Sequence, residues 1–382
     1  MQTVSSNFLA AVQGSTTPVF TADLWKDGTF IASLPLESAS VAFDANNNVQ
    51  GSCSLVVADA DGSLTPTSTG SPFTPFGASV NIRAGFQIGT SVETVSLGWF
   101  LIWDMEIEEA WATMTDSFSN STLVRKGSRI TASGRDFMQK IVDYKFLAPT
   151  APTKSTVWAE IQYLVGDVVQ TITPSYSGYA DVALANQNIT YGEDRMEAVK
   201  ALAGLLQAEP VMTVNGQLTL KPINPVQSAA NTAPTFGFNI NTTEYKKTLT
   251  RDGVYNVVVA QGKGTDSTNL VAYAVQDAGA YSFYGAMGPR PVFYSSDLLT
   301  TSGAVQAWAT SLLSTTTTQN TQTVPIKALP NPAIELGDYV SFTMQGTSAM
   351  QGVSVTARIV AFTYSSEGEM DVTISLPQNW IG

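Results

Sequence analysis

The sequence predicts a mainly β chain with an α+β region in its middle. Apolar and polar residues alternate with a period of two in the first and last thirds, which is typical of half-buried strands. Helical spacing dominates between them. At 382 residues the chain suggests two to four domains, and 44% apolar residues suffice for real cores. We therefore expect three regions, at residues 1–150, 151–240 and 241–382.

The first region begins with a short amphipathic helix within Met1 to Gly14 and continues with strands from Pro18 to about Ala132. Several strands at this spacing favour a small barrel or sandwich. Helical spacing then returns from Gly134 to Phe146. The expected strands include Val19–Trp25, Ala39–Phe43, Ser54–Ala58, Ser79–Ala84 and the long stretch Val92–Ile107.

The middle region contains two helices and a hairpin. Val157, Trp158, Ile161 and Leu164 share one stripe of a helix from about Ser155 to Val165. In the second helix, Asp194 is the expected N-cap, Glu197 can complete a capping box, and Pro210 ends the helical run. Asn215-Gly216 then predicts a tight turn between short strands at Val211–Val214 and Gln217–Leu220.

The last region returns to strands after a polar linker at Asn224–Asn241. One helix, at about Ser302–Ser314, interrupts it. Two β-rich regions therefore flank an α+β region. The expected strands are Gly253–Gly262, Leu270–Val275, Val324–Ala328, Tyr339–Met344, Thr356–Tyr364 and Met370–Leu376.

The composition argues against several classes of function. The net charge is -12, from 19 basic and 31 acidic residues, so a basic nucleic-acid-binding surface is not expected. Only 13% of residues are charged, about half the usual share of roughly 25%. Neutral polar residues fill the surface instead, which suits a structural protein with many polar contacts.

Histidine is absent, which excludes histidine-dependent catalysis and histidine metal sites within this chain. Cys53 is the single cysteine, so an intrachain disulfide or a CxxC metal site cannot form. No apolar run approaches the roughly 18–20 residues of a membrane span, and no targeting signal is visible. We expect a non-enzyme without cofactor or metal, made in a cytoplasm.

Two groups of carboxylates are candidate sites. Asp104, Glu106 and Glu108 alternate along one strand face, roughly 7 Å apart, beside Trp103 and Trp111. A glycosidase could use such a pair, but a solvated polar face, directed towards a channel, is the favoured interpretation.

The segment Asp59–Ser63 resembles the start of a calcium loop. A complete loop needs Glu at the twelfth position, where this chain has Gly70. We therefore expect a turn between strands.

The order of motifs resembles the tail hub, or minor tail, proteins of long-tailed phages, especially those of actinobacterial hosts. The opening Val4–Ser15 is similar to that of the family, as is the strand, Pro-rich loop and strand of Leu55–Gly85. Leu336 replaces the usual proline of the last motif. The other motifs are Ala132–Asp136 leading into a helix, the Asp194 helix with its Asn215-Gly216 hairpin, and Asn331–Val340.

This resemblance implies two small β-barrel domains with α+β domains between them. It further implies a homotrimeric ring at the virion tail tip, or baseplate. The ring would join the sixfold tail tube and distal tail protein to a threefold spike or fibre, near the tape-measure protein, and would leave a channel for DNA ejection. We hypothesise that Asp104, Glu106 and Glu108 approach that lumen and reduce sticking of DNA.

The alternative is a receptor- or carbohydrate-binding tail-tip protein, with or without weak glycan hydrolase activity. It would place Trp103 and Trp111 in an open groove. A hub would bury these rings in a barrel core or a subunit interface.

Overall fold

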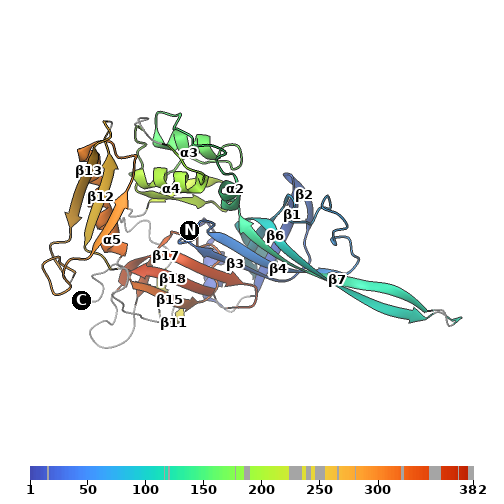
Figure 1. The fold of residues 1–382 in the computed structure, drawn as a ribbon. Coiled ribbons are helices and arrows are strands. Elements are labelled where there is room, and N and C mark those ends of the chain that lie inside the picture. The colour runs from blue at the N-terminus through green and yellow to red at the C-terminus, as the bar shows by residue number, and fades with distance from the viewer. Residues whose placement is uncertain are drawn as a thin grey trace.

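The computed structural model describes most of the chain, and its strands form one large antiparallel sheet beside two α+β layers (Figure 1). The described residues are 1–14, 17–115, 117–118, 121–176, 178–184, 190–222, 235–237, 242–245, 254–264, 266–279, 281–319, 322–343, 354–368 and 370–376.

The large sheet takes strands from both ends of the chain. Its order is β11-β15-β18-β17-β3-β4-β7-β6-β5-β1-β2, with β16 also paired to β17 and β10 paired to β16. The N-terminal strands are β1 (Pro18–Lys26), β2 (Thr29–Ser33), β3 (Leu36–Asp44), β4 (Gly51–Asp59), β5 (Ala78–Ile88), β6 (Ser91–Thr115) and β7 (Ser121–Asp136). The C-terminal strands are β10 (Thr235–Gly237), β11 (Thr242–Tyr245), β15 (Gln322–Ala328), β16 (Tyr339–Thr343), β17 (Ser354–Ser365) and β18 (Met370–Leu376).

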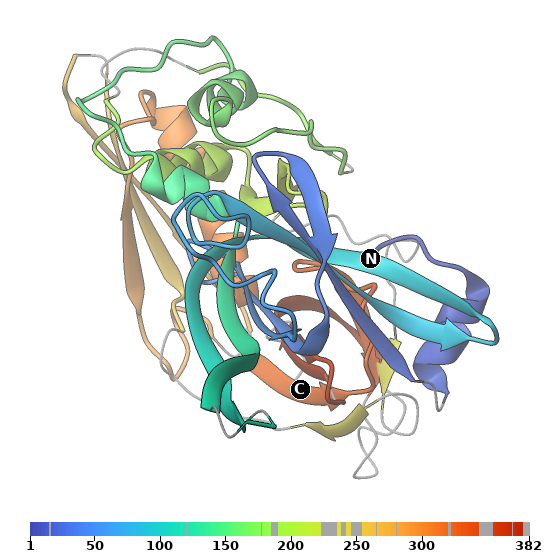
Figure 2. The ribbon, with the colours of Figure 1, turned by 90° about the vertical axis from the view of Figure 1, so that its right-hand side faces the viewer.

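The two β-rich regions meet where β17 pairs with β3, with Ala361–Ser365 antiparallel to Ser40–Asp44. Because the sheet is continuous, one hydrophobic cluster draws side chains from both regions, including Leu55 and Tyr364. Figure 2 shows the strong curvature of the sheet around this core. The predicted fold class, mainly β with an α+β middle, is confirmed. Among the described strands, no pairing closes either region into a separate barrel.

The N-terminal helix and the middle helices lie where the sequence predicts them, with shifted ends. Helix α1 (Ser6–Gln13) is capped by the Ser5 hydroxyl and buries Phe8 against Phe86. The helix expected from Gly134 begins only at Met138, because β7 stays paired with β4 as far as Arg135 and with β6 as far as Asp136. The middle helices are α2 (Met138–Asp143), α3 (Val157–Val165) and α4 (Arg195–Leu205).

The predicted hairpin forms from β8 (Ala208–Met212) and β9 (Leu218–Pro222). Pro210 lies inside β8 and does not end the helix, because α4 already stops at Leu205. Gly216 adopts a φ of +73°, and a Cβ there would lie 3.0 Å from the Phe137 ring. Glycine is therefore required at this turn both for its backbone conformation and for the close approach of that ring.

The second α+β layer is a three-stranded sheet with a helix on one face. Its elements are β12 (Val257–Lys263), β13 (Asn269–Val275), β14 (Pro291–Ser295) and α5 (Ser302–Gln319). Val305 and Ala309 of α5 are buried against Ala260, as the helical spacing predicts. Strand β14 was not predicted. The predicted linker Asn224–Asn241 falls outside the described residues, except for β10, which is a strand.

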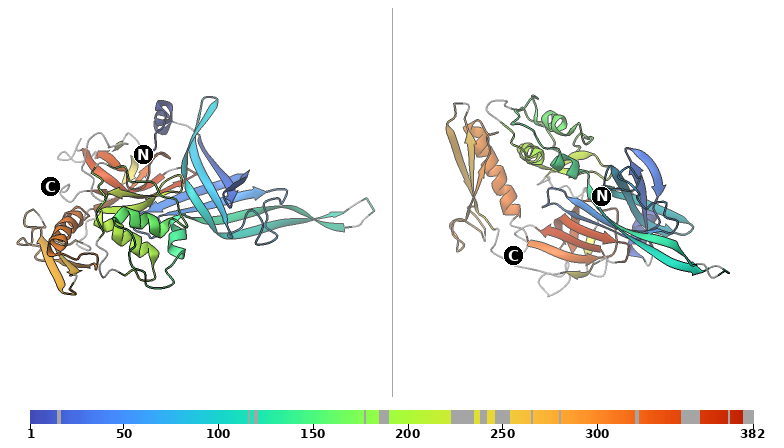
Figure 3. Two further views of the ribbon diagram at one scale, coloured as in Figure 1. Left: turned by 90° about the horizontal axis from the view of Figure 1, so that it is seen from above. Right: turned by 45° about the vertical axis from the view of Figure 1, so that its right-hand side comes forward.

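Figure 3 shows this second layer at the opposite end of the molecule from the long β6–β7 hairpin. The α2–α4 layer lies between the two ends (Figure 3). The boundaries at 150 and 240 stay a prediction.

Replacing Asp194 with Ala tests the predicted cap of α4. The Asp194 carboxylate accepts a hydrogen bond from the Glu197 backbone N–H at 3.0 Å. Losing it should lower the free energy of unfolding by about 1 kcal/mol. Denaturant unfolding followed by circular dichroism measures the loss. Asp194→Asn keeps an acceptor and is the control; equal losses in both variants would contradict a capping role.

Candidate assembly surfaces

The solvent face of the large sheet is rich in hydroxyl groups. Residues at alternate strand positions point away from the core, and the strand registers place them side by side across both β-rich regions. The hydroxyl residues on this outer face are Ser38, Ser40, Ser52, Ser54, Thr131, Ser133, Thr323, Thr363, Ser365, Thr373 and Ser375. The sheet therefore presents a broad and mostly neutral polar surface.

The three predicted carboxylates lie on this outer face of β6. Asp104, Glu106 and Glu108 are exposed and sit opposite Ser133, Thr131 and Arg129 of β7. The residues between them, Met105 and Ile107, pack against the core. The expected alternation along one face is therefore present. From Asp104 outward, β6 is also an edge strand, because its pairing with β5 stops at Leu101.

Trp103 and Trp111 occupy different faces of the β6–β7 hairpin. Trp103 lies at a bulge on the outer face, with the Arg135 guanidinium 4.2 Å from its ring centre. Trp111 is paired with Arg125, whose side chain contacts Glu109 on the inner face.

The two rings are 41% and 52% exposed, so neither lies in the core. The two rings are eight positions apart along the strand, which corresponds to roughly 27 Å. They do not share one groove, although each is available to a partner.

The outer half of this hairpin forms an arm that projects from the body (Figure 1). The pairing of β7 with β4 ends at Ser128, and beyond it the described residues of the arm contain only two strands. Apolar side chains of the arm are widely exposed: Trp111 (52%), Met114 (54%), Leu123 (62%) and Phe118 (84%). Such exposure is typical of an interaction surface.

A hydrogen-bonded cluster fixes the base of the arm. The buried Asp59 carboxylate accepts hydrogen bonds from Leu64 N at 3.2 Å and from the hydroxyls of Thr65 and Ser128 at 2.5 and 3.0 Å. Burial raises the pKa of Asp59, but these donors outweigh it and hold the pKa below its usual value. Arg125 donates to the Thr65 hydroxyl at 2.7 Å.

The Asp59–Ser63 segment is therefore a turn, as expected, with Asp61 accepting from Ser63 N at 3.0 Å. The part of the chain that the structure describes holds no group of three acidic or cysteine side chains arranged to bind a metal.

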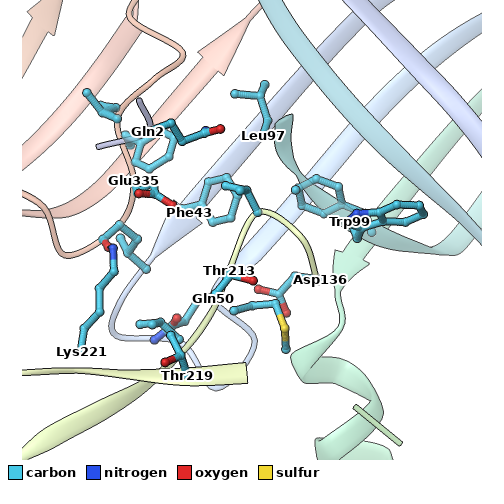
Figure 4. A pocket seen from close by; sticks show the side chains of 18 residues that line it. Gln2, Phe43, Gln50, Leu97, Trp99, Asp136, Thr213, Thr219, Lys221 and Glu335 are labelled. Carbon is cyan, nitrogen blue, oxygen red and sulfur yellow. The ribbon is translucent and has the colours of Figure 1, made fainter. Parts of the chain in front are cut away.

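A small cavity lies where the β8–β9 hairpin meets the large sheet (Figure 4). Its volume of about 50 Å³ has room for one or two waters. Ion pairs beside it join the hairpin to the C-terminal strands: Arg358 with Glu209, and Lys221 with Asp338 at 3.6 Å. Lys221 also donates to the Leu336 carbonyl at 2.7 Å. The Asn331–Val340 motif therefore belongs to this junction.

Asp136 lies at the same junction, just before α2. It is almost fully buried and accepts hydrogen bonds from Gly51 N at 2.6 Å and Met138 N at 2.9 Å. Burial is the larger effect and raises the pKa of Asp136 to about 7, although both donors oppose the rise. The cavity is a structural junction, with one carboxyl group that is sensitive to pH.

Comparison with known proteins gives matches in structure only. No family model matches the chain, and no curated protein matches it in sequence. A tail protein from Neisseria meningitidis MC58 matches with a TM-score of 0.61 and 12% identity, over 93% of this chain and 96% of that one.

The 43 kDa tail protein of prophage MuSo2 from Shewanella oneidensis matches with a TM-score of 0.56 and 11% identity, over 93% of this chain and 98% of that one. Prophage tail protein gp18 from Listeria monocytogenes EGD-e matches with a TM-score of 0.54 and 13% identity, over 94% of this chain and 96% of that one.

The chain therefore has the fold of phage tail proteins, along nearly its whole length. The resemblance to that class inferred from the sequence is confirmed at the level of the fold. Among the described residues, no helix is long and apolar enough to cross a membrane.

Asp136→Asn should flatten the pH dependence of stability. The carboxyl group has a pKa near 7 in the folded chain and about 3.8 when unfolded, so the folded state retains a proton that the unfolded state loses. Its contribution to the free energy of unfolding is fully present below about pH 4 and is lost as the pH rises to about 7. Above that pH, this group no longer changes the stability.

The free energy of unfolding should change with pH by up to about 1.4 kcal/mol per pH unit because of this group. The titration of other carboxylates adds to that change. Urea unfolding of both proteins from pH 4.5 to 8 isolates this component as the difference between them. Parallel curves would rule out Asp136 as its source.

Proposed function

We propose that this chain is a structural virion protein, a hub of the tail tip or baseplate of a long-tailed phage. Three copies form a ring that joins the sixfold tail tube and distal tail protein to a threefold spike or fibre. The likeness to a tail protein and to two prophage tail proteins, over at least 93% of the chain, carries this proposal. In this role the chain is not an enzyme, and its partners include the tape-measure protein.

The outer face of the large sheet suits a surface that DNA passes. Its hydroxyls are neutral, and Asp104, Glu106 and Glu108 add three negative charges, against the positive charges of Arg129 and Arg135 on the neighbouring strand β7. Phosphates are repelled by such a surface. Three chains at a net charge of -12 carry 3 × -12, or about -36. We infer that this face approaches the lumen of the ring.

A receptor- or carbohydrate-binding role is the second candidate, and the exposure of Trp103 and Trp111 is the observation that favours it. Exposed rings can stack on sugars. Because the two rings lie on opposite faces, a glycan would engage one of them. Hydrolysis by Asp104 and Glu106 would have to occur on an open strand face.

Electron cryomicroscopy of the native tail tip tests the hub directly. We expect three copies around an axial channel below the sixfold tube. Peripheral copies, away from the axis, would overturn the hub and favour the receptor-binding role.

Reversing the charge at Asp104, Glu106 and Glu108 to Lys should slow DNA ejection. Three lysines per chain would place nine new cations beside the passing phosphates, and their attraction should weaken as salt rises. We expect ejection to slow by about tenfold at low salt, measured by dye uptake into released DNA.

The matched control reverses Glu197, Asp277 and Asp297, three exposed acids away from β6, and gives the same total charge. Equal slowing in both variants would exclude a specific role of the β6 carboxylates.

A further inference from the structure

We propose that the arm of one copy docks on the exposed face of the β13-β12-β14 sheet of a neighbouring copy. The arm is defined as Ala110–Thr115 of β6 and Ser121–Val124 of β7, with Phe118 at its tip. The proposal rests on the proposed ring in one respect, that copies of this chain are neighbours.

The arm is built in a way that requires a partner. Two strands without a third are marginally stable in water. Both edges of the arm lack a hydrogen-bonded neighbour among the described residues. Closer to the body, Asp104, Glu106 and Glu108 place charge on the free edge of β6, which protects an edge against unwanted pairing. The arm strands carry no charged residue at all.

The receiving face is an unpartnered apolar row on the second α+β layer. Leu270, Ala272 and Ala274 of β13 pack towards α5, so the alternate residues face solvent. The registers then align Tyr273, Val259 and Phe293 across the three strands. Tyr273 is 67% and Phe293 65% exposed, with Val271 beside them at 61%.

The two surfaces match in chemistry and in position. Both are neutral at their centres, so docking buries no unpaired charge. Each aromatic side chain brings roughly 150–250 Å² of surface, so Trp111, Tyr273 and Phe293 together supply at most about half of the roughly 1,600 Å² of a standard interface, and the surrounding residues of both surfaces must supply the rest.

They lie at opposite ends of the molecule, so one chain cannot join them to each other (Figure 3). Contact between unlike surfaces of identical copies is heterologous, and it closes a ring when the rotation between copies allows. Every copy of the chain carries both surfaces, so in a ring the arm of each copy can meet the receiving face of the next copy, and we take a second copy as the partner.

Cysteine crosslinking tests the contact in assembled tails. Thr113 lies on the arm beside Trp111, and Ser295 lies on the receiving face beside Phe293. The native Cys53 is buried, and burial raises the pKa of its thiol, so it stays unreactive. With a short bismaleimide, the T113C/S295C chain should give covalent dimers and trimers on denaturing gels.

T113C alone and S295C alone should stay monomeric, because the contact joins unlike surfaces. T113C/E197C, with its second cysteine on exposed α4, is the matched control and should also stay monomeric. Crosslinks from T113C alone, or none from T113C/S295C, would overturn the proposal. If microscopy shows three axial copies but no crosslinks form, the docking contact is wrong and the proposed hub still holds. If crosslinks form but the copies are peripheral, the docking contact holds and the hub is wrong.

Polar substitution of either surface gives an independent readout. W111S/L123S and Y273S/F293S should each lower incorporation into tails by about tenfold, and the combination should lower it little further, because both remove one contact. The melting temperature of each purified chain should change little, since these side chains are exposed. I31S/V92S removes exposed apolar groups elsewhere and should assemble normally. If the combined variant lost incorporation by the product of the two single losses, the two surfaces would take part in separate contacts, which would contradict the proposal.

Discussion

The pairing of β17 with β3 is the interaction on which the rest of the structure depends. It joins Ala361–Ser365 to Ser40–Asp44, segments more than three hundred residues apart. Because the strands are in register, the alternation of each β-rich region continues into the other. Leu55 and Tyr364 therefore reach one core, and the serines and threonines of both regions reach one outer face. A shift by one residue would turn hydroxyls inward and apolar groups outward.

That pairing also brings strands of both regions to the β8–β9 hairpin, which lines a mainly apolar cavity together with Phe43 and Phe362. Buried backbone groups at this junction need partners, and polar side chains supply them. Asp136 satisfies two backbone N–H groups, and the Arg358–Glu209 and Lys221–Asp338 pairs fix the hairpin to the C-terminal strands. The junction thus holds the α+β layer in place, at the cost of burying one carboxyl group whose pKa rises.

Local patterns in the sequence predicted most elements, and long-range pairing is what they could not predict. The Asp194 cap, the Asn215-Gly216 turn and the apolar stripe of α3 are local, and all three are present. The helix expected at Gly134 was wrong at its start because pairing of β7 with β4 outweighs helical spacing there. Strand β14 is only five residues long, and its alternation of Phe293 with inward-facing neighbours was too short a signal. The bulge that exposes Trp103 leaves no mark in composition.

The surface of the chain is divided into apolar regions and a hydroxyl-rich region. Large exposed apolar side chains lie at the two ends, on the arm and on the β13-β12-β14 face, while the outer face of the broad sheet between them is rich in hydroxyl groups and carries Trp103 and the β6 carboxylates. Hydroxyls remain well hydrated and give little affinity for an opposing surface, whereas desolvated aromatics dominate binding energy. In the ring that we propose, such a chain would associate through its ends and leave its sheet face free. A subunit needs that division if it holds its neighbours while DNA passes along its sheet.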